Sequence, residues 1–477
     1  PRDRRPGLKE ESSTATMSGE SRESLGSSPT SKHQQILQLE DLAVKLYTGT
    51  QEEKNQANLA LLPFTSSLEY IPQCQLILDN SKVPYAQLLA SQSLLKLITT
   101  FWNNFAKGSV DIRNYILNYL GTNLPTLPSY VTSSLIQVLV RITKLGWKME
   151  PHRDICNQVT RLLQHSVKHC ILGLQILNEL VSEMSSNSGL QGVQHRKVVS
   201  SSFRESALLF VFQLSLTTLK QIQSKGKVQG DKDLNTMATQ ALGLAGKCLS
   251  FDHIGTDYEE PSEEHVVLQV PTSWKVIIED GSTVRLVFEL YAILPPPHTA
   301  ACLEIAVLLA SIRRTLFSSE SERLRLLSNL VSGAKDALTS IMSTQDSDTY
   351  HQYCRLLGRI MTNFQLSDLQ SLEGYHDWIK MLSQFTIKSF GIYQFAANSI
   401  HFLLGLWSRL AIEAPFSKGD LSTFLETFMP QVVTNAFISA RLDAVIRLVR
   451  GGETDEIFAE PDLTDQLKQL PNLARFK

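Results

Sequence analysis

The sequence predicts an all-α protein that folds as an α-α superhelix, a HEAT-repeat solenoid of armadillo-like type. Apolar residues recur at helical spacing from about His33 to about residue 450, and short breaks containing proline separate the helical segments. Alternation of apolar and polar residues over a useful length is absent, and 266–270 is the only run that suits an extended strand. A single bundle of about twenty helices would exceed the size at which one core stops growing, so stacked repeats are the better prediction.

Four stretches show the helical spacing most clearly. In each, apolar residues fall three or four positions apart, which places them on one face of a helix. The four stripes are Ile112, Tyr115, Ile116, Tyr119 and Leu120; Val131, Leu135, Val138, Ile142 and Leu145; Val167, Ile171, Leu174, Leu177 and Val181; and Ile400, Leu403, Leu404, Trp407 and Leu410.

Prolines mark where the helices begin or end, because proline lacks the backbone N–H and has a fixed φ. At about 42 residues per helix pair, residues 33–450 would hold roughly ten pairs. The prolines that fall at these breaks are Pro72, Pro84, Pro125, Pro128, Pro151, Pro295, Pro296, Pro297, Pro415 and Pro430.

The N-terminal segment 1–32 differs from the rest of the chain. It is polar, rich in Ser, Gly and Thr, and has too little apolar surface to offset the cost of ordering, so we predict a disordered or mis-assigned extension. The chain begins with Pro1, and Met17 is a candidate start.

Composition and charge exclude several classes of protein. Hydrophobic residues make up 43% and the net charge is −2, which argues against global disorder and against a basic protein that coats nucleic acid. No apolar run approaches the roughly 18 residues of a membrane span, so we expect no membrane insertion. We expect six reduced, mostly buried thiols in a cytosolic or nuclear protein, because the cysteines are scattered. They are Cys74, Cys156, Cys170, Cys248, Cys302 and Cys354.

The sequence contains no glycine-rich phosphate loop, no HExxH and no GxSxG, so we predict no enzyme and no cofactor. His165 and His169 lie four residues apart beside Cys170, and His351 lies three residues before Cys354. A zinc site needs about four ligands, and two isolated pairs do not supply them, so we expect no metal site.

Two basic clusters and one acidic run have alternative interpretations. The basic residues are either solvated helix ends or a patch for an acidic partner, and the lack of interleaved aromatics disfavours nucleic acid. The acidic run is either a solvated insertion or a loop on the binding face of the solenoid. The basic clusters are His195, Arg196, Lys197 and Arg204, and Arg313, Arg314, Arg323 and Arg325; the acidic loop at 257–264 contains Asp257, Glu259, Glu260, Glu263 and Glu264.

Nine segments in register resemble the Ran-binding exportin-7 branch of the importin-β (karyopherin-β) superfamily, N-terminal half. They are DIRNYILNYL at 111–120, RITKLGW at 141–147, SSFRES at 201–206, FDHIGT at 251–256, VPTSWK at 270–275, SIRRTLFSSESER at 311–323, YHQYCRLLGRI at 350–360, FAANSIHFLLGLW at 395–407 and FISARLDAV at 437–445.

The resemblance implies a division of the chain. Residues 33–122 would form N-terminal HEAT repeats that include an importin-β N-terminal domain at about 56–122, and 123–450 would hold further repeats with the acidic insertion. The segment 451–477 is acidic and departs from the family pattern, and family members continue for about as long again. We therefore expect a truncated chain that holds the N-terminal half.

The resemblance also implies a function. Such exportins bind Ran-GTP and protein cargo together, pass FG-repeat nucleoporins in the nuclear pore, and shuttle between nucleus and cytoplasm; nucleic acid is not a partner. Alternatives are a HEAT-repeat scaffold or adaptor without nucleotide dependence, or an importin-type receptor. The second helices of the first pairs, roughly 52–66, 84–99 and 128–146, would line the concave face and contact Ran. Their candidate residues are Gln87, Gln92, Lys96, Gln137 and Arg141, and the acidic loop would contact Ran or cargo.

Overall fold

The computed structural model describes residues 29–186, 192–226, 230–253, 268–392, 396 and 398–413. Within them the prediction of an all-α fold is confirmed, since every regular element is a helix. The 266–270 run contributes one isolated parallel bridge, between Leu268 and Ile312. The chain divides into two compact units, residues 1–94 and 95–477.

In the first unit, α1 packs against α2 and α3. The ring of Tyr47 on α1 stacks on that of Tyr85 at the start of α4, with 5.5 Å between centroids. A capping box of Thr50 and Glu53 starts α2. The helix predicted at 52–66 is shorter in the structure, because a 3-10 turn follows α2. The elements are α1 (Pro29–Thr48), α2 (Gln51–Leu61), η1 (Pro63–Thr65), η2 (Leu68–Tyr70), α3 (Ile71–Asn80) and α4 (Pro84–Thr100), which continues into the second unit.

The second unit contains most of the helices. They are α5 (Trp102–Phe105), η3 (Ala106–Gly108), α6 (Ser109–Asn123), α7 (Ser129–Leu145), α8 (Glu150–Arg153), α9 (Ile155–His165), α10 (Val167–Ser185), α11 (Val193–Ser206), α12 (Leu208–Lys225), α13 (Lys232–Leu249), η4 (Thr272–Trp274), α14 (Lys275–Ile278), α15 (Ser282–Ile293), α16 (His298–Ala310), η5 (Arg314–Leu316), α17 (Glu320–Ile341), α18 (Ser347–Asn363), α19 (Leu366–Gln370), α20 (Tyr375–Gly391) and α22 (Ile400–Glu413).

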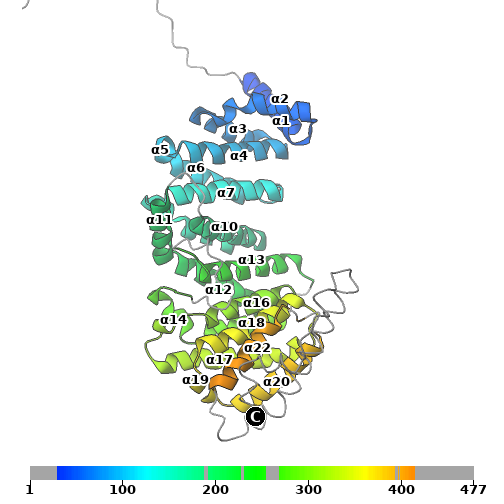
Figure 1. The fold of residues 1–477 in the computed structure, drawn as a ribbon. Coiled ribbons are helices and arrows are strands. Elements are labelled where there is room, and N and C mark those ends of the chain that lie inside the picture. Colours follow the sequence, from blue (N-terminus) through cyan, green and yellow to red (C-terminus); the bar gives the residue numbers. More distant parts are fainter. Residues whose placement is uncertain are drawn as a thin grey trace, which may run out of the picture. The chain divides into compact units, whose positions relative to one another are not determined.

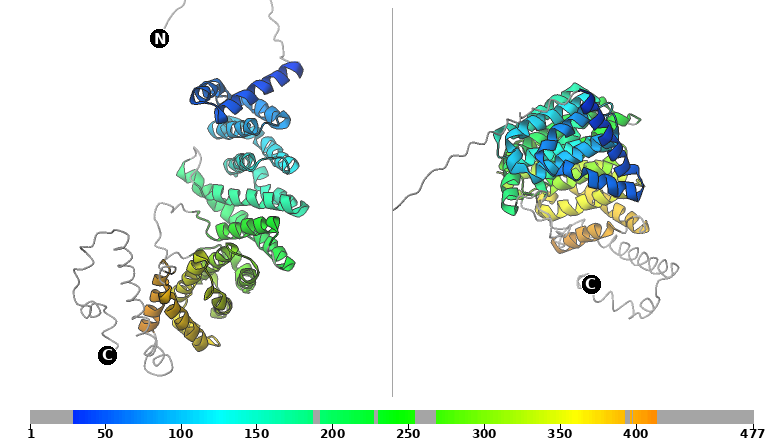
Figure 2. Two further views of the ribbon diagram at one scale, coloured as in Figure 1. Left: turned by 90° about the vertical axis from the view of Figure 1, so that its right-hand side faces the viewer. Right: turned by 90° about the horizontal axis from the view of Figure 1, so that it is seen from above.

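These helices form two layers of stacked pairs, as a solenoid requires. We call α7, α10, α13, α16, α18 and α22 the second-helix layer, and α6, α9, α12, α15, α17 and α20 the first-helix layer. Each second helix contacts its partner in the first-helix layer and the next second helix along the chain. Figures 1 and 2 show the pairs of this unit stacked in chain order. The predicted repeat architecture is confirmed.

The predicted apolar stripes lie mostly in the core. All five stripe residues of α7 are buried, and α6, α10 and α22 bury most of theirs. The exceptions are Tyr115 and Ile171, which are half-buried, and Val167 and Leu404, which are exposed. Prolines fall where predicted in the described part of the chain, since Pro72 lies in the first turn of α3 and Pro84 begins α4. Pro128 is the N-cap of α7.

Three aromatic residues from separate segments meet where α11 packs against α10 and α12. Trp147 follows α7, Phe203 lies on α11 and Phe251 follows α13. The ring centroids of Trp147 and Phe203 are 5.3 Å apart in an edge-on arrangement, and those of Phe203 and Phe251 are 5.6 Å apart. The Trp147 Nε1 donates a hydrogen bond to Ser202 Oγ at 3.2 Å. This aromatic joint connects three consecutive repeats.

A buried histidine lies where α6, α7 and α8 meet. His152 Nε2 is 3.0 Å from Ser109 Oγ, which itself donates to the Ala106 carbonyl at 2.7 Å. The Ser109 hydroxyl oxygen therefore accepts a hydrogen bond from the protonated Nε2 of His152. In this neutral tautomer Nδ1 carries no proton, and it is buried without a hydrogen-bond partner. Gly146 permits this arrangement, because a Cβ there would lie 2.4 Å from the imidazole.

We predict that Trp147→Ala lowers the free energy of unfolding by about 3–5 kcal/mol, because the side chain is 1% exposed and its removal leaves a large cavity. Urea unfolding followed by circular dichroism measures the change. Val276→Ala is the matched control, because Val276 is 73% exposed, and it should change stability by no more than about 0.5 kcal/mol. Equal changes in the free energy of unfolding for the two substitutions would contradict a stabilising role of the aromatic joint.

We also predict a pH dependence caused by His152. Burial lowers the pKa of His152 to about 4, with a smaller contribution from the charge of Arg113. Between pH 6.5 and pH 4 the unfolded chain binds more protons at this residue than the folded chain, so stability falls as the pH falls through this range, by roughly 3 kcal/mol. Unfolding midpoints at pH 7 and pH 4.5 should therefore differ less in a His152→Gln variant than in the unchanged chain. An unchanged difference would contradict a neutral buried His152.

Candidate protein-binding surface

The second-helix layer presents polar side chains on the face that is not buried. Exposed positions include Gln137 on α7, Lys247 on α13, Glu304 on α16 and His401 on α22. The opposite faces of these helices are apolar and buried. A row of stacked helices with polar exposed positions is suited to contact a protein surface rather than to enclose a small substrate.

Two of the three predicted residues on α4, Gln87 and Gln92, lie in the first unit and make contacts within it. Gln92 is exposed, and its Oε1 accepts a hydrogen bond from the Tyr47 hydroxyl at 2.7 Å. Gln87 is half-buried, and its Nε2 donates to the Ser81 carbonyl at 3.0 Å. Gln87 thus holds the turn that precedes α4, whereas Gln92 remains accessible from solvent.

In the second unit, the other three predicted residues differ in accessibility. Lys96 on α4 and Gln137 on α7 are exposed. Arg141 on α7 is partly buried, and its Nε lies 2.8 Å from Glu183 Oε1 on α10. Lys96 and Gln137 are thus accessible from solvent, whereas Arg141 is held by a carboxylate of the next repeat.

Glu183 is the centre of a small ionic network that sequence reasoning missed. Its Oε1 also lies 3.4 Å from Lys144 Nζ, which donates to the Ser186 carbonyl at 2.9 Å. Burial lowers the pKa of Lys144, and the charge of Glu183 opposes this change. The network therefore joins α7 to α10 through one carboxylate that two basic side chains share. The only sequence signal is that Arg141 and Glu183 are 42 residues apart, about one repeat.

The first basic cluster is largely structural. Arg196 is buried, donates to the Ser185 carbonyl at 2.6 Å and pairs with Asp252 at 3.8 Å. Arg204 donates to the Gln269 carbonyl at 2.6 Å. Arg196 is therefore neither a solvated helix end nor part of a partner patch. Its guanidinium ties the start of α11 to the end of α10 through the Ser185 carbonyl.

The second basic cluster also contains a buried member. Arg323 pairs with Asp368 at 3.1 Å and lies 4.8 Å from the centre of the Phe364 ring. The expectation of a solvated helix end is therefore wrong for Arg323. Arg313, Arg314 and Arg325 are exposed, and Arg314 pairs with Glu320 at 2.7 Å.

The histidine and cysteine pairs have structural contacts. The rings of His165 and His169 pack in a tilted arrangement with 4.4 Å between centroids, and His169 Nε2 lies 3.1 Å from the Gly121 carbonyl oxygen. His351 Nδ1 lies 3.1 Å from Ser399 Oγ. All six cysteines are buried and free, as predicted. Over the described ranges, no three His, Cys, Asp or Glu side chains are grouped so that they could hold a metal ion.

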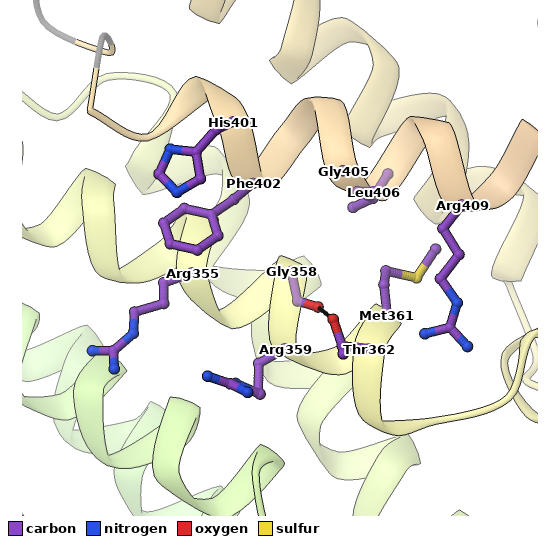
Figure 3. A pocket seen from close by; sticks show the side chains of 10 residues that line it. All are labelled: Arg355, Gly358, Arg359, Met361, Thr362, His401, Phe402, Gly405, Leu406 and Arg409. Atoms are coloured by element: carbon purple, nitrogen blue, oxygen red, sulfur yellow. Dashed lines mark hydrogen bonds between the residues drawn. The ribbon is translucent and has the colours of Figure 1, made fainter. Parts of the chain in front are cut away.

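Two clefts in the second unit could receive part of a partner. One lies between α15 and α17 in the first-helix layer, has a volume of about 680 Å³ and is lined in part by Phe288, Tyr291 and Leu294. The other lies between α18 and α22 in the second-helix layer, measures about 170 Å³ and is lined by three arginines and a histidine (Figure 3). The predicted acidic loop at 257–264 lies outside the described residues. Where the structure is described, no helix is both long and apolar enough to cross a bilayer.

Comparison with known proteins places these features in a family context. Residues 57–122 match the family described as Importin-beta N-terminal domain. Over 449 residues, 93% of this chain, the sequence is 40% identical to Exportin-7-A of Xenopus laevis and 37% identical to Ran-binding protein 17 of Homo sapiens. Ran-binding protein 16 of Drosophila melanogaster is 36% identical over 451 residues. The chain spans about two fifths of the length of these relatives, 40–41% in each case.

We predict that Glu183→Gln lowers the free energy of unfolding by about 2–4 kcal/mol, because it leaves the buried Lys144 and the partly buried Arg141 without their shared carboxylate. Urea unfolding measures the change. Glu179→Gln, one turn earlier on α10, removes the same charge from a position that is only half-buried and is the matched control, with an expected change within about 0.5 kcal/mol. Equal losses in the two variants would contradict the network.

Proposed function

The chain belongs to the exportin-7 branch of the importin-β family, and from this premise we propose that it is the Ran-binding and cargo-binding part of a nuclear export receptor. Two relatives carry the name Ran-binding protein and another the name exportin. Their similarity extends over nearly the whole chain, and this single observation carries the proposal. The names describe transport and binding, which supports a role other than catalysis.

The surface that contacts Ran would be formed by α4 and α7. Lys96 falls within the region that matches the Importin-beta N-terminal domain, and it is exposed, as is Gln137. A basic and an amide side chain suit the polar surface of a small GTPase, because an interface of this kind gains specificity from charge complementarity. Arg141 would contribute indirectly, since its pairing with Glu183 holds α7 against α10.

Cargo would bind further along the second-helix layer, together with Ran in the GTP form. Each partner would order neighbouring repeats, so binding of one lowers the cost of binding the other. The repeats suit this coupling, because each contacts mainly its neighbours. The acidic loop at 257–264 would contact Ran or cargo, and cargo binding that occurs without Ran would favour an importin-type receptor instead.

Passage through the pore would use the first-helix layer. The cleft between α15 and α17 is lined by Phe288, Leu294 and Pro296 among others, and its volume of about 680 Å³ can receive an aromatic side chain. Gly333 on α17 lets the Phe288 ring pack closely, because a Cβ there would lie 2.1 Å from that ring. We assign this cleft to FG-repeat nucleoporins, which implies that the chain shuttles between nucleus and cytoplasm.

We predict that the full chain binds Ran loaded with GTP at least about tenfold more tightly than Ran loaded with GDP, and that Lys96→Glu weakens the GTP-dependent binding about tenfold. Biolayer interferometry measures both. The matched control is Lys220→Glu, because Lys220 is an exposed lysine of α12 in the first-helix layer and undergoes the same change of charge. It should change the affinity less than twofold.

Charge reversal of Arg141 is a poorer test, because it would also remove the partner of Glu183. Equal affinity for the two nucleotide forms would contradict the export proposal and favour a HEAT-repeat scaffold or adaptor. Equal losses of Ran affinity in Lys96→Glu and Lys220→Glu would contradict a Ran-binding surface on α4. They would not contradict Ran binding itself.

A further inference from the structure

The connection between α17 and α18 contains an exposed serine that is followed by an acidic residue three positions later. Ser343 comes directly after the end of α17, and Asp346 is the N-cap of α18. Ser343 is exposed, and so is Asp348, five positions after it. A kinase with a basic substrate groove selects serines that are followed by carboxylates, because charge complementarity gives the enzyme its specificity.

The backbone around Ser343 distinguishes it from the other hydroxyl residues with this spacing. In the described ranges four others have an acidic residue three positions later, and that acidic residue always lies in an α-helix or a 3-10 helix. A kinase could bind the hydroxyl and the carboxylate of such a pair together only after a helical turn had unfolded, which costs free energy. Residues 344–346 lie outside any helix, so Ser343 does not carry this cost. The four other residues are Thr50, Ser66, Ser202 and Ser319.

The hydroxyl of Ser343 makes one hydrogen bond to the described part of the chain. It donates to the Ser340 carbonyl in the last turn of α17, at 3.0 Å. Transfer of a phosphoryl group to the hydroxyl replaces its proton and therefore removes this single bond. Ser340 and Thr344 both line the cleft between α15 and α17, which places Ser343 at the edge of that cleft.

A lysine of α20 lies beside this serine. Lys388 is exposed, and its Nζ donates to the carbonyl of Met342, the residue directly before Ser343. Among the described residues no carboxylate pairs with Lys388. A phosphoserine carries about −1.5 to −2 charges at pH 7 and three acceptor oxygens, so the Lys388 ammonium can serve as its counter-charge. Such a pair would offset the repulsion between a phosphate and the C-terminal carbonyls of α17.

We propose that Ser343 is a phosphorylation site for an acidophilic serine kinase and that Lys388 pairs with the phosphate. The kinase transfers the γ-phosphoryl group of ATP to Ser343 Oγ. A new P–O bond forms at Oγ, the bond to the leaving ADP breaks, and the hydroxyl proton passes to the catalytic base of the kinase. The product adds negative charge at the edge of the α15–α17 cleft and joins the α17–α18 connection to α20.

The first test incubates the full chain with casein kinase 2 and ATP and locates the phosphate by mass spectrometry. Ser343 should reach an occupancy at least about fivefold above that of the four other hydroxyl residues, because its segment needs no helical turn to unfold. A synthetic peptide of residues 340–349 is the control for recognition of the sequence. An unlabelled peptide, a labelled peptide with Ser343 of the chain unlabelled, or equal occupancy of Ser343 and Ser66 would each overturn the proposal.

A second test removes the acidic residue that the kinase would recognise. Asparagine is as good an N-cap as aspartate, so Asp346→Asn should keep the start of α18. Loss of the charge should lower the rate of Ser343 phosphorylation about tenfold. Asp377→Asn is the matched control, because Asp377 is an exposed aspartate in the first turn of α20, and it should change the rate by less than about twofold. Equal rates in the two variants would contradict recognition of the acidic residue.

A third test addresses the counter-charge. Lys388→Gln should lower the midpoint of thermal unfolding by about 1–2 °C more in the phosphorylated chain than in the unphosphorylated chain, because the phosphate gives the ammonium an anionic partner. Lys380→Gln removes the same charge from an exposed position of α20 and should show no such difference. Equal losses in the two states of the chain for Lys388→Gln would overturn the pairing. None of these measurements involves Ran, so their failure would leave the proposed function unchanged.

Discussion

The fold of the second unit depends on contacts between residues about one repeat apart. Each second helix buries its apolar face against the next one, and a polar contact often joins the same two helices. Arg141 pairs with Glu183 between α7 and α10, Asn178 donates to the Gln240 carbonyl between α10 and α13, and Thr299 bonds Thr349 between α16 and α18. Because every repeat lacks a closed core of its own, stability comes from the sum of these neighbour contacts.

The segments that carry the family resemblance are largely the ones that join repeats. Trp147, Phe203 and Phe251 come from three of these segments and form the aromatic joint at α11. Trp274 of a fourth is fully buried and stacks on Phe212 at 4.9 Å. The segments that carry the resemblance therefore identify residues that hold the repeats together. The residues proposed to contact Ran, Lys96 and Gln137, lie at exposed positions outside these joints.

Much of the fold could be predicted from the sequence, because helix periodicity and proline breaks are local signals. The stripe of α7 and the helix start at Pro84 are examples. The candidate binding surface was harder to predict from the sequence, because the burial and ion pairing of its side chains depend on contacts between different repeats. Arg196 and Arg323 belong to runs that suggest solvated charge, yet both are buried against partners from other segments. Glu183 has no local signal at all, because its role arises from a contact between neighbouring repeats.

The central claim is that the second-helix surface receives Ran only in its GTP form. Hydrogen–deuterium exchange of the full chain, with Ran-GTP and with Ran-GDP, tests it most directly, since bound surfaces exchange more slowly. The account predicts new protection in peptides from α4 and α7 with Ran-GTP, and none there with Ran-GDP. Protection confined to first-helix peptides such as those of α9 and α12, or equal protection with both nucleotides, would contradict it.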